Sequence, residues 1–366
     1  MFTSQYLFAL IVVAAAVIYF LVKRNSGGIM AMPANYHGSR SPFLDQYSSN
    51  FTDLAEKGRI DPVIGREEEV RKLTQILSRR EKNNAILIGA PGVGKTAIVE
   101  GFAQRIARGD VPEALLGKRV LALDVATLMS GTKYRGEFEQ RAKKIVQEIV
   151  NSNRSIILFV DEVHSLIQSQ GSEGSINLSD ILKPALARGD LQMIGATTFE
   201  EYEKYFKTDL GLERRFQLIE VREPTIKETM TILKGVKNKY REYHKVEFTD
   251  SALEMAVKLT EKMIKNRKLP DKALDALDEA AAMVKVAHLH PALPSVLYQV
   301  AASAHLEVKD LWKKIQQKDQ EILACKSEKE KIKLIEIRER IEKDLSSTGV
   351  VTVDSGDVEK VIKEWV

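Results

Sequence analysis

Short apolar runs, each ending in polar or glycine-rich residues, are the most regular feature of the sequence. They cover residues 85–88, 120–123, 156–160, 191–196 and 216–221. Continuous apolar runs of this length are typical of strands that are buried on both faces of a sheet. Helix-like stretches, such as residues 67–80 and 97–107, lie between these runs. The pattern therefore predicts an α/β fold with a parallel sheet over residues 45–224.

After residue 224 the pattern changes to helices alone. Residues 251–265 and 271–289 carry apolar side chains at spacings of three and four, as amphipathic helices do. Between about 296 and 346 no glycine or proline occurs, and charged residues separate a few regularly spaced leucines and isoleucines. We predict that residues 225–366 form an α-helical lid with an inserted coiled hairpin at about 296–346. A solvated helix pair packed on the lid is the simpler interpretation of that insertion.

The N-terminus is predicted to be a membrane anchor. Residues 2–22 contain no charged side chain, and about 20 apolar residues span a bilayer core. A cleaved signal peptide would have a basic start and a shorter apolar core, and a buried helix would need an adjacent core. We therefore predict one transmembrane helix over residues 1–22. Lys23 and Arg24 follow it, so the positive-inside rule places them and the rest of the chain on the cytoplasmic side of a single-pass membrane protein.

Residues 23–44 are rich in Gly, Ser and Pro and are predicted to form a flexible linker, with a short helix over residues 46–57 after it. The overall composition limits the function only weakly. The chain has 366 residues, 44% hydrophobic and 29% charged, which is ordinary for a globular protein. A net charge of +4 without a basic stripe argues against nucleic acid as the partner. The single cysteine, Cys325, excludes an internal disulfide framework and fits a reducing compartment.

A P-loop is the clearest chemical motif. Its residues are Gly89, Ala90, Pro91, Gly92, Val93, Gly94, Lys95 and Thr96. They lie between an apolar run and a helix-like stretch, which is the context that this motif requires. Glycines let backbone N–H groups turn towards a phosphate, and the following helix adds its positive end. Because Lys95 can reach the β- and γ-phosphates and the Thr96 hydroxyl can hold Mg²⁺, we predict that the protein binds ATP and Mg²⁺.

A pair of acids follows the third apolar run. Asp161 and Glu162 come directly after residues 156–160, as in a Walker-B strand. Ligands gather at the carboxyl ends of strands in parallel sheets. We therefore expect Asp161 to hold Mg²⁺ and Glu162 to act as the general base that polarises the attacking water. His164 is interpreted as a helix-face residue, because no second metal-type ligand lies at a useful spacing.

Two pairs of polar residues border later apolar runs. Thr197 and Thr198 end the fourth run, where a polar side chain would lie near the γ-phosphate and could orient the water. Arg214 and Arg215 precede the fifth run. They could form a solvated surface, or act as arginine fingers on the nucleotide of a neighbouring subunit. The residues alone leave both alternatives open.

An aromatic residue flanked by basic residues and glycines marks a further candidate. Tyr134 lies between Lys133 and Arg135 in the stretch 131–138, which is predicted to be an exposed loop. Such a side chain can grip a polypeptide regardless of its sequence. A surface turn whose tyrosine packs back on the protein is an equally good interpretation of the local sequence.

In combination, these motifs resemble the Clp/heat-shock-type AAA+ unfoldases, and specifically the first of their two ATPase modules. The resemblance begins near Leu44 and extends to the last residue. The stretches that carry it are Asp-Pro-Val-Ile-Gly-Arg at 61–66, the P-loop, Lys-Tyr-Arg-Gly-Glu-Phe-Glu at 133–139, Leu-Phe-Val-Asp-Glu-Val-His at 158–164, Leu-Lys-Pro-Ala-Leu-Ala-Arg-Gly at 182–189, Ile-Gly-Ala-Thr-Thr at 194–198, Leu-Glu-Arg-Arg-Phe at 212–216 and Leu-Pro-Asp-Lys-Ala-Leu-Asp at 269–275.

The resemblance implies roles for the residues left open. It makes Tyr134, with Lys133 and Arg135, the pore loop that grips the substrate. It makes Thr198 the sensor residue beside the γ-phosphate.

It further implies that Arg214 and Arg215 are the arginine-finger pair. Val63, Ile64 and Ile232 match apolar positions that pack on the adenine base. ATP hydrolysis then requires a ring, which the family forms as a homo-hexamer.

The implied function is ATP-dependent threading of an unfolded or membrane-associated polypeptide through a central pore, with a separate peptidase or an adaptor as a further class of partner. The N-terminal substrate-binding domain and the second ATPase module of the family are missing from the sequence, so we expect a membrane-anchored, single-module form. No protease motif is found, and ATP hydrolysis is the enzymatic activity expected. The alternative is a nucleotide-dependent membrane scaffold or assembly factor that does not thread polypeptide.

Overall fold

An α/β domain and a helical domain make up the described part of the chain. The structure is a computed structural model and describes residues 41–130, 135–168, 178–288 and 351–366, with scattered residues between 314 and 340. The predicted anchor, almost all of the predicted linker and most of the predicted hairpin lie outside the described residues. No helix within the described part is both long enough and apolar enough to cross a membrane.

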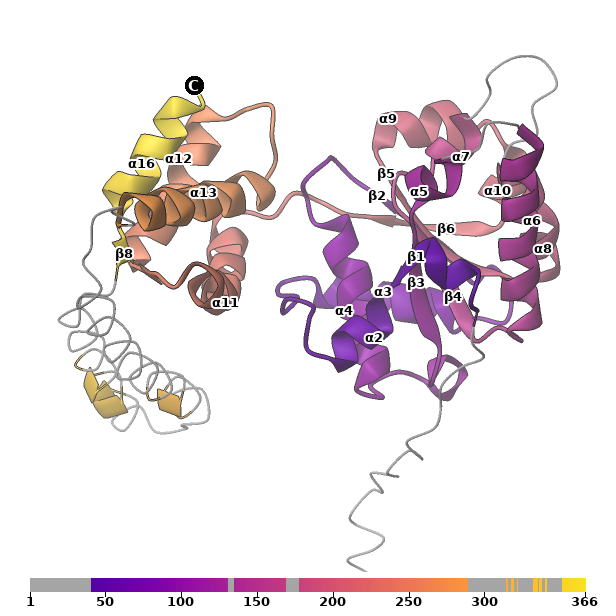
Figure 1. Ribbon diagram of the computed structural model, residues 1–366, viewed down its shortest axis with the longest axis horizontal. Helices are drawn as coiled ribbons and strands as arrows, with labels where there is room; N and C mark the ends of the chain where they lie inside the picture. Colours follow the sequence, from indigo (N-terminus) through magenta and orange to yellow (C-terminus); the bar gives the residue numbers. More distant parts are fainter. Residues whose placement is uncertain are drawn as a thin grey trace, which may run out of the picture. The chain divides into compact units, whose positions relative to one another are not determined.

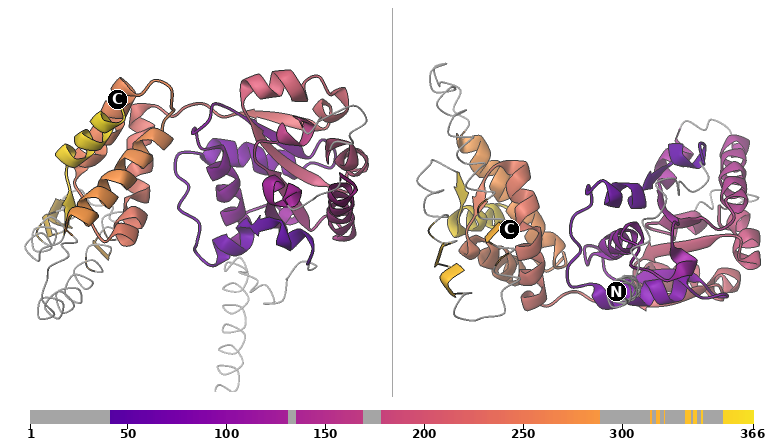
Figure 2. Two further views of the ribbon diagram at one scale, coloured as in Figure 1. Left: turned by 45° about the horizontal axis from the view of Figure 1, so that its top comes forward. Right: turned by 90° about the horizontal axis from the view of Figure 1, so that it is seen from below.

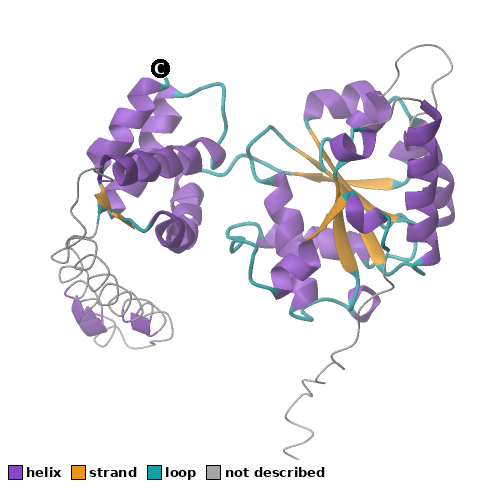
Figure 3. Cartoon of the chain, viewed as in Figure 1, coloured by secondary structure: helices purple, strands orange, loops and turns teal. Residues whose placement is uncertain are grey.

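A six-stranded sheet organises the α/β domain (Figures 1 and 3). Its strands are β1 (Ser48–Asn50), β2 (Asn84–Ile88), β3 (Arg119–Leu123), β4 (Ile156–Val160), β5 (Gln192–Thr197) and β6 (Phe216–Glu220). Their order across the sheet is β1-β3-β4-β5-β2-β6. The five predicted strands are confirmed and pair in parallel. The expectation of a wholly parallel sheet is corrected by β1, which runs antiparallel to β3 where part of a helix was predicted.

Helices cover both faces of this sheet (Figure 1). They are η1 (Leu44–Gln46), α2 (Phe51–Glu56), α3 (Glu67–Leu77), α4 (Lys95–Ala107), η2 (Glu113–Leu115), α5 (Val125–Met129), α6 (Arg135–Asn151), α7 (Ser165–Gln168), α8 (Leu178–Arg188), α9 (Phe199–Glu201), η3 (Tyr202–Phe206) and α10 (Leu210–Glu213). Because side chains alternate along a strand, Ile86 and Leu158 pack towards α6 and α8, whereas Leu87 and Ile157 pack towards α3 and α4. Two cores therefore form, one on each face.

The helical domain has a core of its own. It contains α11 (Ile226–His244), β7 (Glu247–Phe248), α12 (Asp250–Met263), α13 (Asp271–His288), β8 (Thr352–Val353) and α16 (Ser355–Glu364). Strand β8 pairs with β7 and returns the chain to this domain, so that α16 packs against both α12 and α13. Figure 2 shows α16, in yellow, alongside the orange helices. The amphipathic helices predicted after residue 224 are thereby confirmed.

The strand order brings the candidate chemical residues together. In the sheet, β5 lies between β4 and β2, with Ile88 opposite Thr197 and Val160 opposite Gly195. The P-loop after β2, the acid pair after β4 and the threonines at the end of β5 therefore lie at one edge.

Candidate nucleotide site

The P-loop connects β2 to α4 through a bend. Two of its positions, Gly89 and Gly94, can be occupied only by glycine. A Cβ atom on Gly89 would lie 2.4 Å from the carbonyl oxygen of Val221, so the loop passes too close to the end of β6 for any side chain. Gly94, which precedes α4, has a φ of +94°. Glycine adopts this left-handed conformation without steric cost, and the first N–H groups of α4 are thereby directed into the loop.

Lys95 lies within the curve of this loop. Its Nζ donates to the carbonyl oxygens of Gly89, at 2.9 Å, and Ala90, at 3.0 Å. Burial lowers the pKa of Lys95, and the carboxylates of Asp161, Glu201 and Glu162 offset part of that effect. The cationic side chain is therefore held in the loop and faces an acidic wall, which suits it to bridge phosphate groups.

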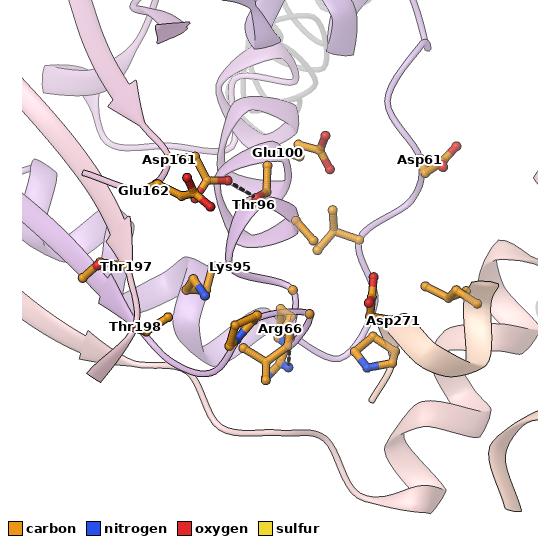
Figure 4. Close-up of a pocket in the computed structure, with 18 of the residues that line it drawn as sticks. Asp61, Arg66, Lys95, Thr96, Glu100, Asp161, Glu162, Thr197, Thr198 and Asp271 are labelled. Carbon is orange, nitrogen blue, oxygen red and sulfur yellow. Dashed lines mark hydrogen bonds between the residues drawn. The ribbon is translucent and has the colours of Figure 1, made fainter. Parts of the chain in front are cut away.

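Thr96 and Asp161 provide a fitting pair of ligands for Mg²⁺. The Thr96 hydroxyl donates to Asp161 Oδ2 at 2.8 Å, and the pair is exposed on the pocket (Figure 4). Hydroxyl and carboxylate oxygens are the ligand types that Mg²⁺ prefers. The structure thus brings together the two residues predicted to hold the metal ion with ATP.

Glu162 sits in a short turn that is tied to the neighbouring strand. Its φ is +47°, an uncommon conformation for a residue other than glycine. The turn is fixed on both sides: Glu162 N donates to Asp161 Oδ1 at 2.9 Å, and Val163 N donates to the carbonyl oxygen of Ala196 at 2.9 Å. The Glu162 side chain lies on the pocket beside Asp161 (Figure 4).

Thr197 and Thr198 both line the pocket, but in different environments. Thr198 is the N-cap of α9 and forms a capping box with Glu201. Thr197 is buried and contacts His164, whose Nδ1 lies 3.1 Å from the Thr197 hydroxyl. His164 is itself buried in the turn before α7, so its interpretation as a helix-face residue was wrong.

Glu201 connects these residues. Burial acts to raise its pKa, but hydrogen bonds from Thr198 and the proximity of His164 outweigh that effect and hold the pKa below its usual value. The Glu201 side chain is therefore an ionised acceptor at neutral pH.

The pocket is an open cavity of about 960 Å³. Its phosphate end consists of the P-loop, Asp161, Glu162 and Thr198. Its apolar end is lined by three residues predicted from the sequence and three that were not: Val63, Ile64, Ile232, Val236, Tyr240 and Leu274. The structure places the predicted apolar residues on the pocket, and their packing on adenine stays a prediction.

Sequence reasoning missed several polar residues of the pocket. Arg66 is buried, and its Nη2 donates to the carbonyl oxygens of Val93, at 2.6 Å, and Arg222, at 3.1 Å. It closes the motif at 61–66 that carried the family resemblance, which is the signal that could have found it. Glu100 also lines the pocket, and burial together with the nearby Asp61 raises its pKa.

The two predicted arginine fingers lie off this pocket. Neither is among the residues that line it. Arg214 Nε donates to the carbonyl oxygen of Leu210 at 3.0 Å, and Arg215 Nη1 to that of Ala187 at 3.2 Å. The structure therefore does not bring these arginines to the phosphate end of their own chain.

The predicted pore loop is described only at its end. Lys133 and Tyr134 lie outside the described residues. Arg135 begins α6, so the exposed loop predicted over residues 131–138 is corrected: its second half is helical.

Comparisons with known proteins agree with this geometry. Residues 85–222 match the family described as "ATPase family associated with various cellular activities (AAA)", and residues 225–346 match the AAA lid domain. The chain is an AAA-family ATPase of the Clp/Hsp100 type. It is 47% identical over 335 residues to the chloroplastic chaperone protein ClpC of Pisum sativum, covering 89% of this chain and 36% of that protein.

Two further relatives support this assignment. The chaperone protein ClpB of Gloeobacter violaceus is 52% identical over 243 residues, which cover 66% of this chain and 28% of that protein. The structure also resembles the Hsp104:casein complex of S. cerevisiae, with a TM-score of 0.62 and 46% identity over 68% of this chain and 42% of the other. The chain thus spans well under half of the length of the relatives it matches.

Proposed function

We propose that this chain hydrolyses ATP within a ring of identical subunits, a homo-hexamer, and uses the energy to thread a polypeptide through a central pore. One observation carries the proposal. The phosphate end of the pocket brings together Lys95, the residues predicted to hold Mg²⁺ and the predicted general base, whereas the arginine pair of the same chain contacts other parts of the domain.

Each residue of the phosphate end has a distinct task. The N–H groups of the P-loop and the Lys95 ammonium group bind and neutralise the phosphates of ATP. Thr96 and Asp161 would hold Mg²⁺, which supplies positive charge next to the phosphate oxygens when it is bound. Glu162 accepts a proton from the attacking water, and Thr198 orients that water.

A ring explains the position of the arginines. Phosphoryl transfer gains about 10³–10⁵-fold in rate from an arginine that neutralises the transition state. Arg214 and Arg215 cannot serve their own pocket from where they lie, but a neighbouring subunit can present its pair to it. Hydrolysis would then depend on assembly.

Two features favour a polypeptide as the substrate. The related Hsp104 structure contains casein, and the sequence of this chain places Tyr134 between two basic residues in the predicted pore loop. Residues 2–22 are free of charge and would tether the ring to a membrane, with the ATPase domain on the cytoplasmic side. A separate peptidase or an adaptor would be a further partner in handling the threaded polypeptide.

The test compares ATPase activity with and without unfolded protein. We expect wild-type turnover to rise with an unfolded protein and to be indifferent to single-stranded DNA. The variants Arg214→Ala and Arg215→Ala should bind ATP but lose at least about a hundredfold in kcat, because the transition-state charge is left uncompensated. Mixing either variant with subunits that carry Glu162→Gln should restore part of the activity, since each partner supplies what the other lacks.

The outcomes separate the two candidate functions. If Tyr134→Ala keeps its ATPase activity and loses the ability to unfold a substrate, threading is supported. If turnover ignores unfolded protein and Tyr134→Ala behaves as wild type, the protein is a nucleotide-dependent scaffold or assembly factor instead.

A further inference from the structure

A cluster of four residues, His164, Thr197, Thr198 and Glu201, joins the end of β5 to the turn that carries Glu162. One oxygen atom, Glu201 Oε2, lies within hydrogen-bonding distance of four donor groups: the Thr198 hydroxyl at 2.8 Å, the Thr198 N–H at 3.2 Å, the Thr197 hydroxyl at 3.2 Å and His164 Nδ1 at 3.1 Å. His164 and Thr197 are 7% and 2% exposed. Thr197 and Thr198 lie on the pocket with Lys95 and Glu162 (Figure 4), and Glu201 also lines it.

The hydrogen bonds determine where each proton lies. The ionised Glu201 carboxylate can only accept hydrogen bonds, so each of the two threonine hydroxyls donates its single proton to it. The Thr197 oxygen and Glu201 Oε2 then present only lone pairs to His164 Nδ1. The imidazole must therefore carry its proton on Nδ1, and its ring is held in place by Tyr205, at a centroid distance of 6.3 Å.

This arrangement gives the Thr198 hydroxyl a defined polarity. Its proton points to Glu201, and it accepts a bond from the Glu201 N–H at 3.3 Å. One lone pair of the hydroxyl oxygen is left, and Thr198 lines the pocket. The Thr198 hydroxyl, after β5, can therefore accept a hydrogen bond from a water molecule. The Glu162 carboxylate, after β4, can accept a second one from the same water.

The same cluster fixes the distance between these two acceptors. Val163, which lies between Glu162 and His164, donates its N–H to Ala196, and a Cβ atom on Gly195 would lie 3.0 Å from the Val163 side chain. The turn is thus attached to β5 by its backbone at Val163 and by its side chain at His164. Movement of either strand end would have to break both attachments.

We propose that Glu201 and His164 are positioning residues that hold the Thr198 hydroxyl and the Glu162 carboxylate as a matched pair of acceptors around the attacking water. The inference rests on the proposed ATP hydrolysis at this pocket. Neither residue transfers a proton; they set the orientation of the two groups that contact the water.

The test uses the full chain and the variant Glu201→Gln. Glutamine also completes a capping box, so α9 should keep its N-terminus and the variant should fold. The amide can donate to Thr198, which removes the fixed polarity. We expect kcat for ATP to fall at least about tenfold, with KM and the Kd for ADP within about twofold of wild type, because only the reacting geometry changes.

Glu200→Gln is the matched control. It removes the same charge from the adjacent position of α9, where the side chain is exposed and outside the cluster. This variant should retain the kcat of the wild type. A thermal unfolding curve for each variant shows whether the fold is intact.

Substitutions of His164 provide a second, independent test. His164→Leu removes the donor and should lower kcat by a similar factor. His164→Asn should restore most of it, because the asparagine Nδ2 can donate from nearly the place of the imidazole Nδ1. A role in packing alone would make leucine, not asparagine, the better replacement.

The inference is overturned if Glu201→Gln turns over ATP within about twofold of the wild type, or if His164→Asn is as impaired as His164→Leu. In that case loss of activity in Glu162→Gln would leave the proposed ATPase function standing. Absence of hydrolysis in the wild type overturns both.

Discussion

The two ends of the pocket are built in different ways. The phosphate end comes from strand ends of one sheet, and its residues are joined by short hydrogen bonds such as that of Thr96 to Asp161 at 2.8 Å. The apolar end combines Ile64, from the loop before α3, with Ile232 and Val236 from α11 of the helical domain. The residues predicted to act on the phosphates therefore come from the sheet domain, whereas part of the apolar lining comes from the lid. Changes at the phosphate end should act on kcat, and changes at the apolar end on affinity.

The largest effect is expected for Glu162→Gln at the phosphate end. A general base contributes about 10²–10⁴-fold, so kcat should fall by about that factor. The Kd for ATP should stay within about threefold of the wild type, because glutamine keeps the shape of the side chain and contributes nothing to the apolar end. Single-turnover hydrolysis and equilibrium binding of a fluorescent ATP analogue measure the two quantities.

A rise in Kd that matched the fall in kcat would contradict the separation of the two ends. The same would hold if Glu162→Gln turned over ATP normally, since the general base would then be another group.

The difference between the ends also explains what the sequence could predict. At the phosphate end, the P-loop from Gly89 to Thr96 and the pair Asp161-Glu162 are each continuous in the sequence. Their chemistry could therefore be predicted from local spacing. The apolar end could be predicted only in part, because Tyr240 and Leu274 reach the pocket through the packing of separate helices.

One strand and one side-chain contact show that parts of the fold could not be predicted from the sequence either. The five predicted strands have apolar runs, but β1 (Ser48–Asn50) is polar and is a strand only because it pairs with β3. His164 and Thr197 are 33 residues apart, and no periodicity indicates that they meet. Contacts of this kind depend on the register of the sheet, which the pattern of one strand does not contain.

An intermediate effect is expected for Gly235→Ala at the apolar end. A Cβ atom on Gly235 would lie 1.7 Å from Ile64 Cδ1, so the methyl group must push Ile64 out of place. Ile64 lines the apolar end of the pocket, so its displacement should weaken binding, and about 1.4 kcal/mol corresponds to a tenfold change in affinity. We expect the Kd for ATP to rise about tenfold, measured by isothermal titration, with kcat at saturating ATP nearly unchanged.

The double variant Gly235→Ala with Ile64→Val provides the control. Valine lacks the Cδ1 atom that the new methyl group meets, so affinity should recover most of the loss. Alanine also favours α11 over glycine by about 1 kcal/mol, so poor helix formation cannot account for a weaker Kd. An affinity unaffected by Gly235→Ala would show that Ile64 does not contact the nucleotide.

The smallest effect is expected for Tyr240→Phe, also at the apolar end. Burial, assisted by Asp278 and other nearby carboxylates, raises the pKa of Tyr240 to about 12 from 10.0. The phenol is therefore neutral at any working pH, and the Kd for ATP should stay within about twofold of wild type between pH 7 and pH 9.

The folded state holds the Tyr240 proton more tightly than the unfolded state does. The stabilities of the wild type and Tyr240→Phe should therefore depend equally on pH below about pH 10. Between about pH 10 and 12 the wild type should lose stability relative to Tyr240→Phe, which thermal unfolding would measure. A loss of affinity in Tyr240→Phe at pH 7 would instead mean that the hydroxyl binds the nucleotide, and the apolar end would then contribute a polar contact as the phosphate end does.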